Sequence, residues 1–297
     1  MYSVNVRNDE FKYDIYPEST ERDLLMSVIY LKKEKNKQDV KFNKNLVRQM
    51  KEYVGTWRKA LPKCTIILFI NGTMPEGILE IVRRDNIKLI PFIKDDNIEI
   101  VLQRYYIFHD YISRNIDKYD RVGFLDAKDI MLQQDIFKYY DKKKSLIFMY
   151  ECKNFGDDDC IRFSTFPIGT SINSWMTHTY NLSVTKNFHM NKRVNINGGF
   201  TFGDINSVTK FLRMELDDGD VLIKNGKAYA FGTDQSILNY LVVESNKFKE
   251  IFPYHQIFSC QKQHFCMFYK RWKRVDGIVI STEEEGVVTP LIHKLVN

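Results

Sequence analysis

Short apolar segments alternate with amphipathic helical segments along this chain, and that alternation limits the folds open to it. Residues 40–61 carry apolar side chains at helical spacing and end at Pro62, which predicts a helix. Residues 24–31 before it and 65–70 after it are β-rich apolar runs, and Asn71-Gly72 closes the second with a turn signal. Strand–helix–strand units in series predict a mostly parallel sheet with right-handed crossovers.

The alternation continues toward the C-terminus. Further strands are expected at residues 88–93, 121–125, 145–150 and 194–197. Further helices are expected at residues 75–84, 99–119, 207–216 and 234–243. After about Phe248 the pattern becomes irregular, and no internal repeat or Pro/Gly/Ser-rich linker divides the chain. We therefore expect an α/β fold: one Rossmann-like domain over residues 1–297, with helices flanking the central sheet.

Composition and charge exclude several classes of protein. Apolar residues make up 44% and aromatic residues 14% of the chain, which rules out disordered and collagen-like sequences. The net charge of +6 is spread along the chain, and this mild basic excess suits a phosphate-bearing ligand. Abundant Tyr and Phe keep a nucleic-acid-binding module as an alternative, but no stripe of alternating Arg and aromatic residues supports it.

Cysteine usage and hydropathy predict the compartment. The five cysteines are an odd number at irregular spacing, which argues against a secreted disulfide framework and favours a reducing compartment. No stretch approaches the roughly 20 apolar residues that a membrane span needs. The first residues, 1–12, carry charges where a signal peptide would have its apolar run. We therefore expect a soluble, cytoplasmic protein.

The strongest site signal is a pair of carboxylates at the end of a predicted strand. The apolar strand at 121–125 runs directly into Asp126, and Asp129 follows after two intervening residues. In open α/β sheets the ligand crevice lies beyond the carboxyl ends of the strands. Carboxylate pairs bind hard divalent ions such as Mg²⁺ and Mn²⁺ and leave positions open for substrate phosphates. The spacing alone also permits a structural interpretation, in which Asp126 ends the strand and Asp129 caps a following helix.

Four stretches resemble motifs of GT-A-type, nucleotide-sugar-dependent glycosyltransferases, in the order expected for that family. Residues 119–137, which include both carboxylates, are similar to its acidic-motif region. Residues 195–203 resemble its Asn-Gly-rich strand, residues 233–239 its Asp-Gln helix start, and residues 290–294 its C-terminal His motif. The resemblance covers roughly residues 24–294.

The resemblance implies a transferase that moves a sugar from a UDP- or GDP-linked donor to a hydroxyl acceptor with the help of Mn²⁺ or Mg²⁺. Carried over residue by residue, it implies Asp126, Asp129 and His293 as metal ligands. A metal on the donor diphosphate would stabilise the charge that develops on the leaving group. The chain departs from the commoner acidic motif, which has one residue between its carboxylates, because Ala127 and Lys128 intervene here.

The same resemblance implies roles for further polar residues. Arg104 and Lys294 are cations that could contact the donor phosphates, although an ordinary helix-surface Arg and a tail Lys would look the same. Asn197-Gly198-Gly199 suits a sugar hydroxyl packed against main chain, or else a β-bulge or tight turn. Asp234 could contact sugar hydroxyls, act as the general base of an inverting enzyme, or be only a helix N-cap.

These assignments divide the chain into a nucleotide-sugar-binding half at residues 24–130 and an acceptor-binding half at residues 131–297. Trp175 lies in a stretch that resembles the acceptor side, where it could stack on a sugar ring or simply belong to the core. No residue stands out as a nucleophile, so retention and inversion both stay open. A nucleotidyltransferase of related fold is the main enzymatic alternative, but residues 24–37 contain no glycine where its phosphate loop would lie. A degenerate transferase that only binds sugar is another.

Overall fold

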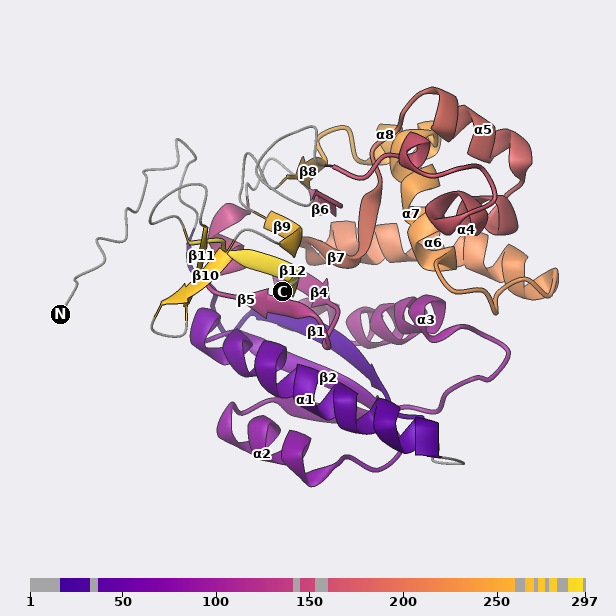
Figure 1. Ribbon diagram of the computed structural model, residues 1–297. Helices are drawn as coiled ribbons and strands as arrows, with labels where there is room; N and C mark the ends of the chain where they lie inside the picture. The colour runs from indigo at the N-terminus through magenta and orange to yellow at the C-terminus, as the bar shows by residue number, and fades with distance from the viewer. Residues whose placement is uncertain are drawn as a thin grey trace.

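The computed structural model describes residues 17–32, 37–140, 145–152, 160–259, 265–269, 272–275, 278–281 and 288–295. Its centre is a seven-stranded sheet with the strand order β3-β2-β1-β4-β7-β6-β8 (Figure 1). The strands of this sheet are β1 (Asp23–Tyr30), β2 (Thr65–Asn71), β3 (Lys88–Pro91), β4 (Arg121–Leu125), β6 (Leu146–Tyr150), β7 (Ile196–Asp204) and β8 (Gln256–Phe258). Strand β7 runs antiparallel to both of its neighbours, and the remaining pairs are parallel. The expected α/β architecture with a mostly parallel sheet is confirmed.

Helices cover both faces of this sheet (Figure 1). They are α1 (Lys37–Ala60), α2 (Glu76–Arg84), α3 (Ile100–Ser113), α4 (Ser171–Thr179), α5 (Leu182–Met190), α6 (Ile205–Lys224), α7 (Thr233–Val243) and α8 (Asn246–Ile251). Leu25 and Ile29 of β1 pack with α1 and α2, whereas Leu24 and Met26 pack with α3 and α6. Successive strand residues point to opposite faces, so β1 is buried on both sides and reads as a continuous apolar run.

Smaller sheets lie beside the main one. Strands β5 (Ile130–Leu132), β12 (Leu291–Leu295) and β9 (Phe265–Tyr269) form one in the order β5-β12-β9. Strands β10 (Trp272–Val275) and β11 (Ile278–Ser281) form another. Short strands therefore follow Phe248, where the sequence pattern was irregular, because β12 pairs with segments that a local pattern does not report.

Most predicted elements are present with shifted ends. The helix expected at residues 99–119 ends at Ser113, just after its last buried residue, Ile112. The strand expected at residues 194–197 is β7, which runs on to Asp204 because Phe200 and Phe202 are fully buried in the sheet despite the neighbouring glycines. The Asp204 side chain then accepts a hydrogen bond from the Ser207 N–H and begins α6.

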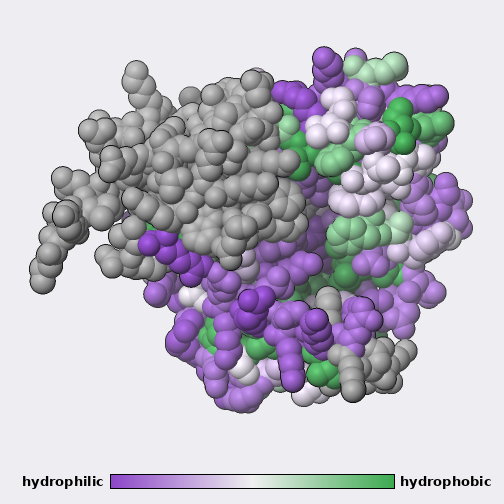
Figure 2. All heavy atoms as spheres, viewed as in Figure 1, coloured by the Kyte–Doolittle hydropathy of each residue, from purple (hydrophilic) through white to green (hydrophobic). Residues whose placement is uncertain are grey.

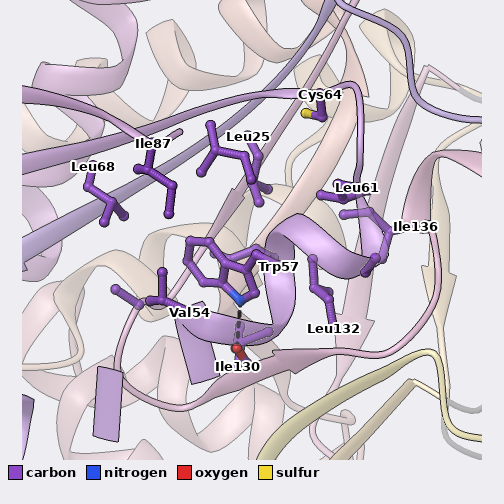
Figure 3. Close-up of a cluster of buried hydrophobic side chains, with 14 of the residues drawn as sticks. Leu25, Val54, Trp57, Leu61, Cys64, Leu68, Ile87, Ile130, Leu132 and Ile136 are labelled. Carbon is purple, nitrogen blue, oxygen red and sulfur yellow. Dashed lines mark hydrogen bonds between the residues drawn. The ribbon is translucent and has the colours of Figure 1, made fainter. Parts of the chain in front are cut away.

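The hydrophobic core beside α1 holds β5, a strand of the β5-β12-β9 sheet, in place (Figure 3). Trp57 of α1 is fully buried among apolar side chains from β1, β2 and β5. Its indole Nε1–H donates a hydrogen bond of 2.8 Å to the Ile130 carbonyl, the first residue of β5. Because Ile130 directly follows Asp129, this bond fixes the backbone beside the acidic motif.

Cysteine chemistry differs from the expectation. Cys152 and Cys160 form a disulfide across an isolated antiparallel bridge, and Cys64 is a buried free thiol. The number and spacing of the cysteines argued against a disulfide framework, but they do not report which backbone segments meet. Here an isolated bridge just after β6 brings the two sulfur atoms together. A disulfide is more typical of oxidising compartments than of the reducing one we expected. Among the described helices, none is sufficiently long and apolar to cross a membrane.

Candidate metal centre and adjoining cavity

The two carboxylates of the acidic motif lie at the carboxyl end of β4. The Asp126 N–H continues the β4–β7 ladder by donating a hydrogen bond of 3.0 Å to the Gly199 carbonyl. The chain then turns and enters β5 directly after Asp129. The interpretation of Asp129 as a helix cap was therefore wrong, because a strand follows it. Strand β5 pairs antiparallel with β12, with His293 opposite Ile130, and this register brings His293 beside the acidic motif.

Asp126, Asp129 and His293 form a cluster that could hold a metal ion. The Nε2 atom of His293 lies 3.1 Å from Asp129 Oδ1 and 3.9 Å from Asp126 Oδ2. One ligand atom from each residue lies within 4.8 Å of the others. At metal–oxygen distances of about 2.1 Å, neighbouring ligands of an octahedral ion lie about 3.0 Å apart and opposite ones about 4.2 Å apart. The three side chains therefore fit one hard divalent ion, and the departure from the commoner acidic spacing does not separate them.

Asp126, Asp129 and His293 differ in how far their side chains are exposed to the cavity, where a substrate would bind. Asp129 and His293 are buried, while Asp126 is partly exposed and lines a cavity with Lys128, which is exposed. An ion held here would have protein ligands on its inner side and open positions toward the cavity, as catalytic metal sites require.

Arg104 connects the acidic motif to a second buried carboxylate. Its guanidinium comes from α3 and is itself buried. Nη1 donates to Asp126 Oδ1, and Nη2 donates to Asp234 Oδ2 at 2.6 Å and to the Gly198 carbonyl at 2.5 Å. Both terminal nitrogens are thus engaged with protein groups, although Arg104 also lines the cavity. A direct phosphate contact by Arg104 stays a prediction, whereas its positioning of the two carboxylates is observed.

Asp234 lies in the first turn of α7, at the cavity wall. The N-cap of this helix is Gly232, so the interpretation of Asp234 as an N-cap was wrong. Burial raises the pKa of the Asp234 carboxyl, and the adjacent Arg104 guanidinium opposes that shift. Asp234 therefore lines the cavity, and its ion pair with Arg104 sets the orientation of its carboxyl group.

Gly198 and Gly199 allow close packing, as the sequence predicted, but the groups that approach them belong to the protein. A Cβ atom on Gly199 would lie 2.6 Å from Asp126 Oδ2, and one on Gly198 would lie 3.1 Å from Asp234 Oδ2. The pairing of β7 with β6 also shifts register beside these glycines, which is compatible with the β-bulge interpretation. The Gly-Gly pair therefore makes room for both site carboxylates.

Asn197 is held by a carboxylate that the sequence analysis did not single out. Glu151 is buried at the end of β6, lines the cavity, and accepts hydrogen bonds from Asn195 at 2.5 Å, Asn197 at 3.0 Å and Gln235 at 3.0 Å. The Asn197 Oδ1 in turn accepts from the Gly199 N–H at 2.8 Å. Glu151 follows the strand at 146–150 in the way that Asp126 follows β4. The rule that polar residues after strands face the ligand crevice could have found it.

The cavity that joins these residues has a volume of about 380 Å³. Apolar side chains at the end of β1 and the start of α3 line one part of it: Val28, Tyr30, Ile100 and Val101. Aromatic side chains near α4 and α7 line another: Phe166, Trp175 and Phe231. In Figure 1, β1 and α3 lie below α4 and α7. Its volume and its mixed lining are those of a small-molecule site.

The structure thus brings together the predicted residues Arg104, Asp126, Asp129, Asn197, Gly198, Asp234 and His293. Lys294 follows His293 in β12, and its side chain lies outside the described residues. Comparison of the chain with models of known protein families and with curated proteins finds no match. The functional interpretation therefore depends on the geometry of this site.

Proposed function

We propose that this protein is a metal-dependent glycosyltransferase of GT-A type that moves a sugar from a UDP- or GDP-linked donor to a hydroxyl acceptor. The observation that carries the proposal is the cluster of Asp126, Asp129 and His293 at a strand end of a mostly parallel sheet, in the wall of a cavity. Two carboxylates and an imidazole suit Mn²⁺ or Mg²⁺, and a diphosphate would complete the coordination from the cavity side.

The cluster would hold the ion, and the ion would supply stabilisation of the negative charge on the departing diphosphate. Lys128 lies exposed in the cavity wall between the two acids and would add positive charge near the same phosphates. Val28 and Tyr30, at the end of β1, would contact the nucleoside through their apolar surfaces. These contacts orient the donor with its diphosphate at the metal.

Asp234 would bind hydroxyl groups of the transferred sugar. The Arg104 guanidinium fixes its orientation through a hydrogen bond of 2.6 Å, so little rotational freedom is lost when a sugar binds. The same ion pair opposes the rise in pKa that burial causes at Asp234 and already occupies Oδ2, so we assign Asp234 to sugar contact in preference to general-base catalysis. Glu151 would position Asn197 and Gln235, whose amides it holds in the same wall.

Donor binding is the most direct test. Calorimetry with UDP and with GDP, each in the presence of Mn²⁺, should show metal-dependent binding of one nucleotide to the wild-type protein. Asp129→Asn should abolish it. The matched control is Asp110→Asn, which changes an exposed aspartate of α3 that pairs with Arg114, and it should bind like the wild type.

Turnover is the second part of the test. A panel of UDP- and GDP-sugars with Mn²⁺ should yield released nucleotide and a transferred sugar on an added hydroxyl acceptor. Failure of both nucleotides to bind with metal would overturn the proposal. So would release of pyrophosphate from a nucleoside triphosphate and a sugar phosphate, which is the reaction of a nucleotidyltransferase.

A further inference from the structure

Resting on the proposed function, we infer that the hydroxyl acceptor is itself a carbohydrate, and that its ring binds against an aromatic wall formed by Trp175 and Phe231. This wall lies in the cavity that contains the metal cluster. It is formed by α4 and the segment that leads into α7, and not by β1 and α3, to which we assign the donor nucleoside.

The exposure of the wall is the first argument. Phe231 is 58% exposed although it lines the cavity, and Trp175 is only partly buried. The two rings meet edge to face, with centroids 5.4 Å apart. Phe166 adds a third aromatic side chain to the same lining. Aromatic surface left open inside a cavity is unusual unless a ligand covers it. Figure 2 shows mainly hydrophilic side chains over α1, and a mixture of apolar and hydrophilic ones over α4 and α5.

The second argument is that the wall is rigidly connected to the polar part of the site. Gly232 adopts a φ of +81°, and a Cβ there would lie 2.3 Å from Cδ2 of the Trp175 indole. The indole therefore packs directly on the backbone that begins α7. Asp234 and Gln235 follow within the first turn of that helix and face the same cavity. The aromatic surface and the hydrogen-bonding groups are thus held at fixed positions relative to one another.

The chemistry of this combination selects the acceptor. A pyranose ring presents a flat face of C–H groups and an edge of hydroxyl groups. The first matches an aromatic surface, and the second matches an amide group such as that of Gln235, which lines the same cavity beside Asp234, the residue we assign to the transferred sugar. An acidic acceptor is disfavoured by Glu151, a carboxylate in the wall that accepts hydrogen bonds from the amides of Asn195, Asn197 and Gln235, whereas Asp234 is paired with Arg104. A long lipid chain would need an apolar groove without these polar groups. A neutral sugar satisfies both parts of the surface.

The test compares acceptor use by variants of the wall. Phe231→Ala and Trp175→Phe should each raise the KM for a sugar acceptor by about tenfold or more, because part of the contact surface is lost. The KM for the donor should stay the same in both. Tyr254→Ala is the matched control, since Tyr254 is 66% exposed and is absent from the cavity lining. It should leave the KM for the acceptor unchanged.

The acceptor panel should contain neutral mono- and disaccharides, a serine- and threonine-containing peptide, and a long-chain alcohol. Transfer to the saccharides, weakened in Phe231→Ala, supports the inference. Transfer to the peptide or the alcohol in preference to saccharides overturns it, as does an unchanged KM for saccharides in both wall variants. Absence of metal-dependent nucleotide binding in the wild type would instead show that the proposed function has failed, and this inference with it.

Discussion

Replacement of Arg104 by methionine should destabilise the protein strongly. The guanidinium is the ion-pair partner of both Asp126 and Asp234. Methionine keeps much of the side-chain volume but removes the charge and the donors. The Asp234 side chain is 5% exposed, so it would be left as a buried charge without its cation. Asp126 is 26% exposed and would recover part of its hydration from the cavity, so Asp234 should account for most of the loss.

The expected magnitude follows from these burial values. Removal of one partner from a buried ion pair costs about 3–5 kcal/mol. A chain of 297 residues has an unfolding entropy of about 0.6 kcal/mol per kelvin near its midpoint, so the Tm should fall by about 5–8 °C. Differential scanning calorimetry at pH 7 measures this directly. Asp234→Asn introduced into the Arg104→Met background should recover part of the loss, because it removes the buried charge.

Arg213 provides the matched control. It also pairs with two carboxylates, Asp217 and Asp220, each at 2.9 Å, but its side chain is 45% exposed. Exposed pairs contribute about 0–1 kcal/mol, so Arg213→Met should lower the Tm by less than about 2 °C. If Arg104→Met lowers the Tm no more than Arg213→Met, the argument that burial makes this ion pair structurally important is refuted.

Three further substitutions test other parts of the structure. Gly199→Ala places a Cβ 2.6 Å from Asp126 Oδ2, so Mn²⁺ affinity measured by calorimetry should fall by about tenfold or more; an unchanged affinity would contradict the proposed ligand set. Trp57→Phe removes the hydrogen bond to the Ile130 carbonyl and should lower the free energy of unfolding by about 1–3 kcal/mol in urea titrations, with an unchanged m value. Burial, with nearby Asp234 and Asp218, raises the pKa of the Glu215 carboxyl well above its ordinary value, so the folded state retains a proton that the unfolded chain releases at lower pH. Stability should therefore fall as pH rises above the ordinary carboxyl pKa, and Glu215→Gln should raise the Tm more at pH 8 than at pH 4.5; an equal shift at both values would count against a protonated Glu215.

The pattern of apolar residues predicted the helices and strands whose conformation depends on residues close in the sequence. Strand β4 occupies its predicted range, and α1 differs from its prediction mainly at its first residues. Both carry an apolar pattern that their burial explains. Strand β7 was predicted too short because Gly198 and Gly199 have low strand propensity, and only contact with β4 and β6 makes the segment extended. Strands β5 and β12 have only three and five residues, and their pairing joins distant segments that no local window contains.

Site residues that directly follow a predicted strand could be found from the sequence. Contacts between side chains from distant segments could not. Asp126 was found by its position after β4, and Glu151 satisfies the same criterion after β6 but lacked a second acid nearby to draw attention. His293 came from the resemblance alone, because nothing in residues 290–294 taken by themselves indicates a partner. The sequence indicated a phosphate contact for Arg104, which stays a prediction, but it could not show that the two terminal nitrogens contact Asp126, Asp234 and Gly198.

The site also explains why neither half of the chain could carry the proposed chemistry alone. The acidic motif ends the first half, yet one of its three candidate ligands comes from β12, 164 residues beyond Asp129. Arg104, from the first half, is the group that orients Asp234 in the second. Charged groups from distant parts of the chain therefore compensate one another, since Arg104 pairs with both Asp126 and Asp234. The same contacts that complete the candidate metal cluster and orient Asp234 also satisfy buried charges, so formation of the candidate site and stability of the fold depend on the same few side chains.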